Sequence, residues 1–163
     1  MPLIGIIGKK RDVQLIKRDF QETNIETIQI TKESVSNIKN IKFEQIIFLE
    51  DLKITQESYK YMEEIMSSAK YIILNADIEI NILKQIEILK PLKVITFGFN
   101  SKSTITVSSV KEDKIIVCIQ REMEKVNGEI IEMQEKEIRV REDNKIKMYN
   151  NLVIFIIKEL HNL

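Results

Sequence analysis

The segment Leu3-Ile-Gly-Ile-Ile-Gly8 is a short apolar run closed by a glycine, which is the pattern of a buried strand that ends in a turn. Directly after it, the apolar residues Val13, Ile16 and Phe20 recur at helical spacing, and Asp12 is placed to cap the helix that they predict. The chain is therefore expected to open with a strand followed by a helix from Asp12 to Phe20.

The same alternation of strand and helix continues as far as residue 97. Further strands are predicted at Ile25–Ile30, Glu44–Leu49, Tyr71–Leu74 and Val94–Phe97, with helices at Ser34–Ile41, Gln56–Ser68 and Ile78–Leu89. Parallel neighbours need a long crossover, and a helix is the usual one, so this order indicates parallel β-α-β units.

After Gly98 the pattern changes to β-branched segments separated by polar turns. The segments Thr104–Val110, Lys114–Gln120 and Gly128–Val140 predict an antiparallel meander, and Tyr149–Leu160 predicts a terminal helix with a broad apolar surface. We therefore expect one domain over residues 1–163. Its predicted fold is a three-layer α/β domain with a mainly parallel, Rossmann-like and P-loop-like sheet, an antiparallel C-terminal meander and a closing C-terminal helix.

Composition excludes several classes of function. The 163 residues hold 25 basic and 25 acidic side chains, and a formal net charge of zero argues against nucleic-acid binding. No apolar stretch approaches the roughly 20 residues that a membrane span needs. The N-terminal sequence has no basic segment or cleavage site typical of a signal peptide, so we expect a cytoplasmic protein. Cys118 is the only cysteine, and it is expected in the core.

In an open parallel sheet, ligands bind at the carboxyl ends of the strands, so the loops after Ile7, Ile30, Leu49, Leu74 and Phe97 are the places to search. The first loop begins like a phosphate-binding loop. A P-loop, however, has four residues between its first glycine and Gly-Lys-Ser/Thr, a spacing that is not met here. Gly8 and Lys9 form a candidate anion site, and the alternative is a plain strand-to-helix turn with exposed lysines.

Several strings in this order resemble the central ATP-binding domain of the Mur ligases, the amide-forming enzymes of peptidoglycan precursor synthesis. Ser68-Ala-Lys-Tyr-Ile-Ile-Leu-Asn-Ala-Asp77 is similar to a family segment that ends in Asn-Ala-Asp, and Val94-Ile-Thr-Phe-Gly98 is similar to its Val-Ser/Thr-Phe-Gly strand. The family also continues into a meander and a helix, here represented by Tyr149-Asn-Asn-Leu152. The resemblance covers most of the chain, and the order of the strings carries it.

The resemblance implies that most catalytic residues of the family are lost. The Asn-Gly-Lys-Ser/Thr part of its phosphate loop is missing after Gly8, and its magnesium-binding glutamate falls near the neutral Gln29. Its Glu-Asp-His string is Glu50-Asp51-Leu52 here, which lacks the histidine. The lysine that becomes carbamylated in the family falls at or beside Met62, with Lys60 out of register.

Three further candidate residues lie at or beyond position 75. The family's His-Asn at the start of the last helix falls near Lys147-Met148, whereas Asn151 matches an asparagine that faces adenine. Asn75 and Asp77 are candidate ligand-binding residues, although turn and N-cap roles for a helix from Ile78 are the alternative. Glu50-Asp51 is interpreted as a charged helix entry rather than a metal site.

These observations predict a non-catalytic Mur-ligase-like domain that acts through a protein partner, self-association or a small-molecule ligand. No catalytic residue, metal site or cofactor is expected, nor is binding to nucleic acid or membrane. Gly8, Lys9, Asn75, Asp77 and Asn151 are the candidate cofactor-binding residues. We also expect the family's flanking domains to be absent. The alternative is a nucleotide-binding subunit of an ATP-dependent amide ligase of the peptidoglycan-precursor type.

Overall fold

The computed structural model describes residues 1–140 and 145–163, with side chains except those of residues 145 and 146. Its strands are β1 (Leu3–Ile7), β2 (Glu26–Gln29), β3 (Gln45–Phe48), β4 (Tyr71–Asn75), β5 (Lys93–Phe97), β6 (Ile105–Val110), β7 (Lys114–Ile119), β8 (Met123–Glu124), β9 (Ile130–Ile131) and β10 (Gln134–Arg139). Its helices are α1 (Lys10–Asp19), α2 (Val35–Ile38), the short 3-10 turn η1 (Gln56–Ser58), α3 (Tyr59–Ser68), α4 (Ile82–Gln85) and α5 (Lys145–His161).

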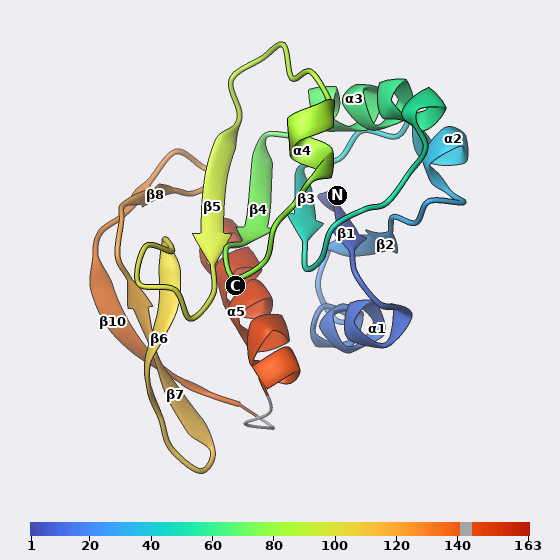
Figure 1. The fold of residues 1–163 in the computed structure, drawn as a ribbon. Coiled ribbons are helices and arrows are strands. Elements are labelled where there is room, and N and C mark those ends of the chain that lie inside the picture. Colours follow the sequence, from blue (N-terminus) through green and yellow to red (C-terminus); the bar gives the residue numbers. More distant parts are fainter. Residues whose placement is uncertain (141–144) are drawn as a thin grey trace. The chain divides into compact units, whose positions relative to one another are not determined.

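Within the described residues, eight strands form a mixed sheet in the order β10-β7-β6-β5-β4-β3-β1-β2 (Figure 1). Strand β1 pairs in parallel with both β2 and β3, and β3 pairs in parallel with β4. Strand β6 runs parallel to β5, whereas β7 pairs antiparallel with β6 and β10. The predicted α/β class, with parallel strands followed by an antiparallel meander, is therefore confirmed.

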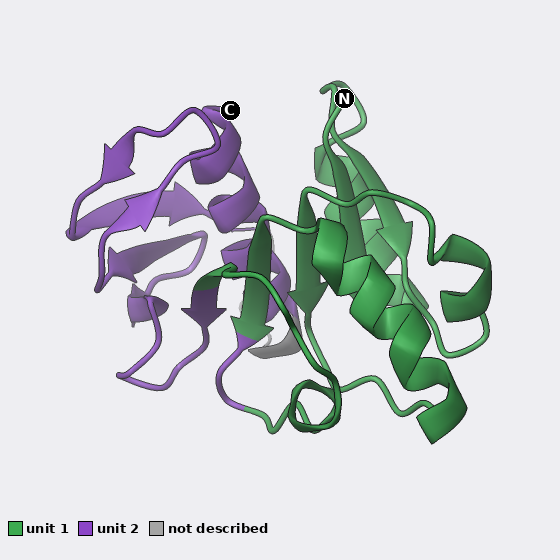
Figure 2. Ribbon diagram, turned by 90° about the horizontal axis from the view of Figure 1, so that it is seen from above, with its two compact units in different colours: residues 1–74, 78–94 green, residues 75–77, 95–163 purple. Residues whose placement is uncertain are grey.

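The chain divides into two compact units, coloured separately in Figure 2. Unit 1 comprises residues 1–74 and 78–94, and unit 2 comprises residues 75–77 and 95–163. The expectation of a single domain stays a prediction.

Unit 1 is built around strands that are buried on both faces. All four residues of β3 are buried, and its Ile46 and Phe48 pack in a cluster with Val35 of α2, Met62 of α3 and Ile82 of α4. The neighbouring side chains of a strand point to the opposite face, so helices are needed on both sides. Consistent with this, α1 lies away from α2, α3 and α4 in Figure 1.

Unit 2 contains the meander and the terminal helix. In β7, Ile115, Val117 and Ile119 are buried, while Cys118 is only partly buried. The expectation that Cys118 belongs to the core is wrong, because strand alternation places it on the opposite face from these neighbours. The predicted apolar surface of α5 is buried throughout, with members Leu152, Val153, Phe155, Ile156 and Ile157.

The predicted helix from Ile78 to Leu89 is much shorter, because only Ile82–Gln85 forms α4. Isoleucines occupy positions 78, 80 and 82 and again positions 86 and 88, and within each group the spacing of two suits extended backbone. Isoleucine is also β-branched and therefore a weak helix former. The predicted N-cap roles of Asn75 and Asp77 are therefore wrong. Lys9 is the N-cap of α1, so Asp12 does not cap that helix and lies instead within its first turn.

The predicted strand Gly128–Val140 is divided into two. Its beginning forms β9, which pairs with β8 in a separate two-stranded sheet, and its end forms β10. The turn between β8 and β9 contains Gly128 at a φ of 91°, a conformation that favours glycine. Among the described residues, none of the helices has the length and apolar character that a membrane span requires.

Candidate functional site

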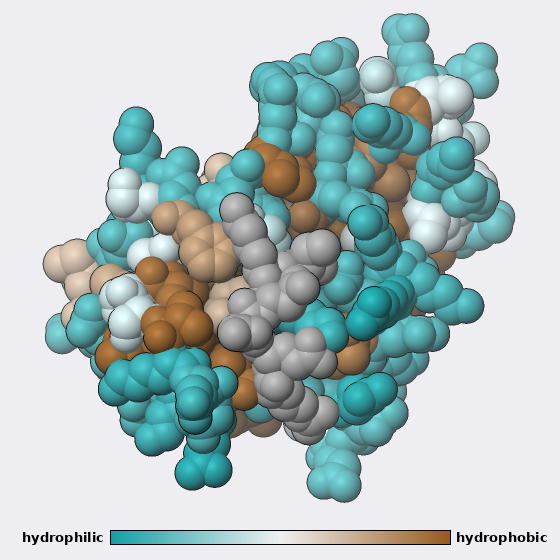
Figure 3. Space-filling model, turned by 60° about the horizontal axis from the view of Figure 1, so that its bottom comes forward, coloured by the Kyte–Doolittle hydropathy of each residue, from teal (hydrophilic) through white to brown (hydrophobic). Residues whose placement is uncertain are grey.

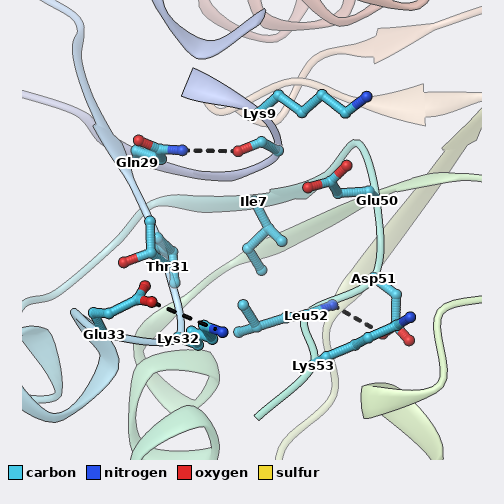
Figure 4. A pocket seen from close by; sticks show the side chains of 12 residues that line it. Ile7, Lys9, Gln29, Thr31, Lys32, Glu33, Glu50, Asp51, Leu52 and Lys53 are labelled. Atoms are coloured by element: carbon cyan, nitrogen blue, oxygen red, sulfur yellow. Dashed lines mark hydrogen bonds and ion pairs between the residues drawn. The ribbon is translucent and has the colours of Figure 1, made fainter. Parts of the chain in front are cut away.

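A cavity of about 620 Å³ lies in unit 1 at the carboxyl ends of β1, β2 and β3 (Figure 4). Three of the five loops predicted from the sequence meet there, namely those that follow Ile7, Ile30 and Leu49. The cavity is lined by Ile7, Gly8, Lys9, Gln29, Ile30, Thr31, Lys32, Glu33, Glu50, Asp51, Leu52 and Lys53. The topology therefore gathers polar residues from distant parts of the sequence, as parallel sheets commonly do.

The turn after β1 is held by contacts within the protein. A Cβ atom on Gly8 would lie 2.8 Å from Leu49 Cδ1, so a side chain here would force the Leu49 side chain to move. The Gln29 side-chain amide donates a hydrogen bond of 2.8 Å to the Gly8 carbonyl oxygen. A glutamate would lack this donor when ionised. Gln29 therefore has a structural role in the loop that the resemblance aligns with phosphate binding.

Asp51 also stabilises the fold around the cavity. Its Oδ1 accepts hydrogen bonds from the backbone N–H groups of Leu52, at 2.9 Å, and Ile82, at 3.1 Å. Asp51 thus lies at the start of α4, and the interpretation as an entry to the following helix is wrong, because η1 begins only at Gln56. A carboxylate at the first turn of a helix satisfies backbone donors that lack helical partners.

The remaining charges of the cavity are balanced. Its lining includes three lysines and three acidic residues, Lys9, Lys32, Lys53, Glu33, Glu50 and Asp51. Lys32 and Glu33 form an exposed ion pair with a nitrogen-to-oxygen distance of 4.0 Å. Lys9 is exposed, and its side chain extends along one edge of the cavity in Figure 4. A site with this balance does not attract a polyanion by net charge.

The residues that the resemblance aligns with metal ligands do not form a metal centre. Met62 is fully buried in the apolar cluster beside α2 and α4. Over the part of the chain that the structure describes, no group of three or more His, Cys, Asp and Glu side chains is arranged to hold a metal ion.

A second polar cluster lies within unit 2, around the Asp77 carboxylate. The Asp77 carboxylate accepts hydrogen bonds from the backbone N–H groups of Phe99, at 2.8 Å, and Asn100, at 3.0 Å. It also accepts one from the Tyr149 hydroxyl, at 2.7 Å. The Asp77 N–H in turn donates to Asn75 Oδ1 at 3.0 Å. The predicted turn role of Asn75 is therefore confirmed, and Asp77 joins the 98–100 turn to α5.

Tyr149 is held in this cluster by both polar and aromatic contacts. Its ring lies edge-on to Phe97, with centroids 6.1 Å apart, and tilted against Phe99 at 5.6 Å. Burial, together with the hydrogen bond to Asp77 and the negative charge of that residue, raises the pKa of Tyr149 above its ordinary value of 10.0. Tyr149 therefore acts as a neutral hydrogen-bond donor at physiological pH.

The structure places the five candidate residues in different environments. Gly8 and Lys9 belong to the cavity of unit 1, whereas Asn75 and Asp77 belong to the hydrogen-bonded cluster of unit 2. Asn151 is partly buried on α5. Their roles in binding a cofactor stay predictions.

The sequence did not predict the hydrogen bonds of two polar residues, Gln29 and Tyr149. The Gln29–Gly8 hydrogen bond joins residues 21 positions apart, and the Tyr149–Asp77 bond joins residues 72 positions apart. Neither pair has a short-range signal, although Tyr149 stands in a string that the family resemblance had drawn attention to. The partner of each residue depends on the folded chain.

Comparisons with known proteins give a likeness of structure only. No protein-family model and no curated protein matches the sequence. Among solved structures, MurF from Acinetobacter baumannii, a Mur ligase, matches with a TM-score of 0.62 and 8% identity. The match covers 99% of this chain and 43% of the MurF chain.

A TM-score of 0.62 at 8% identity shows a shared fold. The chain has a Mur-ligase-like fold, as the order of its sequence strings had predicted. Since fold does not imply function, activity has to be argued from the site.

Proposed function

We propose that this chain is a non-catalytic Mur-ligase-like domain that binds a small polar molecule in the strand-end cavity of unit 1. The observation that carries this proposal is the cavity itself. It offers about 620 Å³ at the carboxyl ends of three parallel strands, which falls within the usual size of small-molecule sites. Lys9, Thr31 and Glu50 line it with an amine, a hydroxyl and a carboxylate.

The chemistry of the lining residues supports binding without phosphoryl transfer. That reaction depends on donors and cations placed around the transferred group. Here the Gln29 amide donates to Gly8, and one Asp51 oxygen accepts two backbone hydrogen bonds. The negative charges of a triphosphate would also meet the carboxylates of Glu33 and Glu50, which repel them.

The alternative is a nucleotide-binding subunit of an ATP-dependent amide ligase. The feature that favours it is the position of the cavity beside the first turn of α1, where backbone N–H groups can bind an anion. Lys9, the N-cap residue of α1, is the lysine in the best position to assist.

Calorimetric titration with ATP, in the presence and absence of Mg²⁺, distinguishes the two proposals. We expect no hydrolysis and no binding in the micromolar range. Lys9→Ala is the test variant, and Lys32→Ala is the matched control, because it removes another lysine from the same cavity. Micromolar binding of Mg-ATP that is lost in Lys9→Ala but retained in Lys32→Ala would establish the nucleotide-binding alternative.

Binding of small molecules is tested by nuclear magnetic resonance with a library of neutral and singly charged polar fragments. We expect shifts in the amide signals of Gly8, Thr31 and Leu52, which belong to the three loops of the cavity. If no fragment shifts these signals while the protein remains folded, the cavity is not a binding site and the proposal is wrong.

A further inference from the structure

Apolar side chains are exposed on the segment from Arg121 to Glu135, called here the acidic hairpin. Val126 is 40% exposed, Ile130 54% and Met133 66%, although the segment is anchored to folded structure. Figure 3 shows a face of the molecule covered largely by hydrophilic residues, with hydrophobic residues in separate areas between them. Val126, Ile130 and Met133 thus expose apolar surface within eight residues of one hairpin.

The pairing of β8 with β9 divides the hairpin into two faces. Met123 pairs with Ile131, and both side chains are buried at 4% exposure. Glu124 pairs with Ile130, so these two side chains share the opposite face. The hairpin thus has an inner apolar face and an outer face that combines an exposed isoleucine with a carboxylate.

Contacts with the end of α5 fix the position of this outer face. The Val126 N–H donates to the Leu160 carbonyl at 3.0 Å, and Lys125 Nζ donates to Asn162 Oδ1 at 2.6 Å. The Lys125 N–H also donates to the Glu129 carbonyl at 2.8 Å across the turn. A surface held in this way loses little conformational entropy when a partner binds.

The hairpin carries a strong local charge in a chain whose net charge is zero. It contains five glutamates against one arginine and one lysine, which leaves a net charge of −3. Its lysine, Lys125, contacts Glu129 at 3.3 Å and Asn162 at 2.6 Å, so this cation already has partners within the hairpin and on the C-terminal segment.

A cavity of about 270 Å³ adjoins the apolar side chains. Ile130 and Glu132 line it from the hairpin, while Lys136 and Glu159 line it from β10 and α5. Lys136 and Glu159 form a two-oxygen ion pair at 2.9 and 3.0 Å, so their charges compensate each other. Of the other lining residues, Ile130 and Ile131 are apolar, whereas Lys125, Gln134 and Glu132 are polar. The cavity therefore offers a mainly polar wall, which includes the Glu132 carboxylate, to an incoming side chain.

We propose that the acidic hairpin is the docking surface for a basic partner protein, one that presents an apolar side chain flanked by lysine or arginine. The apolar residue would cover Ile130 and Met133, and the basic residues would face the glutamates. Burial of apolar area supplies affinity, whereas complementary charge supplies orientation and a faster association. This surface lies in unit 2, and the proposal is independent of the cavity in unit 1.

The probe is a synthetic amphipathic peptide of leucine and lysine, titrated into the labelled full chain and followed by fluorescence anisotropy. A leucine–glutamate peptide of the same length and pattern tests the sign of the charge. The variant Glu132→Lys with Met133→Ser replaces one negative charge by a positive one and removes one apolar side chain from the surface. The matched control is Glu87→Lys with Leu89→Ser in unit 1, where Leu89 is 88% exposed.

We expect the lysine peptide to bind and the hairpin variant to weaken that binding about tenfold or more. The control variant should retain wild-type affinity, and raising the salt concentration should weaken binding. The proposal is overturned if the two peptides bind equally or the lysine peptide does not bind. It is also overturned if both variants weaken binding equally, or if sedimentation shows a wild-type dimer that Met133→Ser dissociates.

Discussion

Replacement of Asp77 by alanine provides a direct test of the hydrogen-bonded cluster in unit 2. The bonds from Phe99 and Asn100 lie on an exposed turn, so those N–H groups can bond to water instead, and each contributes about 0.5–1.5 kcal/mol. The Tyr149 bond is part-buried, and an ionised acceptor makes it worth about 1.5–3 kcal/mol. These contributions are not additive, and Asp77→Ala should lower the free energy of unfolding by about 2–4 kcal/mol.

A double-mutant cycle with Tyr149→Phe isolates the bond between the two side chains. Tyr149→Phe keeps the aromatic contacts and removes the hydroxyl, so it should cost about 1.5–3 kcal/mol. Because both variants break the same bond, we expect a coupling energy of about 1.5–3 kcal/mol in urea unfolding followed by circular dichroism. A coupling close to zero, with each single variant near wild-type stability, would refute the structural role of the cluster.

Alkaline pH gives an independent readout of the same bond. The folded protein holds the Tyr149 proton at pH values where the unfolded chain, with a tyrosine pKa near 10.0, has released it. Stability is thus unaffected below that pH and falls above it, with a limiting slope of about 1.4 kcal/mol per pH unit relative to Tyr149→Phe. Parallel stability curves for the two proteins between neutral pH and the alkaline limit would contradict this reasoning.

Three further predictions concern stability, and urea unfolding measures each of them. Phe155→Ala should cost about 3–5 kcal/mol of stability, because Phe155 is only 6% exposed. Asn151→Ala should cost about 0.5 kcal/mol or less. Equal losses of stability in the two variants would show that Asn151 is a structural residue. Gln29→Glu should cost about 1–3 kcal/mol of stability at neutral pH, because the ionised side chain cannot donate to the Gly8 carbonyl. This destabilisation should become smaller near the ordinary glutamate pKa of about 4.3, where the protonated acid can donate again. Gly8→Ala should cost about 1–3 kcal/mol in the wild type and less in a Leu49→Ala background, since Leu49 is the side chain that the new methyl group would strike.

The strands were predictable from sequence to within two residues for β1 to β7, because apolar and β-branched residues are frequent in them and turn residues separate them. The error in α4 has a different origin. Its residues satisfy a helical template only in part, and the helix starts where Asp51, 31 positions earlier, accepts the Ile82 N–H. A local pattern cannot contain such a contact. The same limit applies to β9 and β10, whose separation depends on pairing with different partners.

The cavity was predictable in position but not in chemistry. Parallel strand ends meet at one edge of a sheet, so the loops after Ile7, Ile30 and Leu49 had to converge once the topology was known. Whether their polar groups are available to a ligand depends on hydrogen bonds that the sequence does not display. Gln29, for example, looks like a lost magnesium ligand in the resemblance, whereas in the structure it is the donor that holds the Gly8 carbonyl.

Residues of two strings that carry the resemblance contact each other within unit 2 and stabilise its fold. Asp77, at the end of the Asn-Ala-Asp string, accepts hydrogen bonds from the turn that begins at Gly98. Gly98 is the last residue of the Val-Ile-Thr-Phe-Gly string, so the two strings are in direct contact. Gly98 has a φ of 151°, and a Cβ atom there would lie 2.7 Å from Asp77 Oδ1, so a side chain is excluded on two grounds. The Ala76 N–H also donates to the Phe97 carbonyl at 2.8 Å. These residues are therefore required by the connection between strands, whatever the domain binds, and a sequence can keep them while its loops change. This explains how short strings identified a Mur-ligase-like fold and yet carried no evidence for ligase activity.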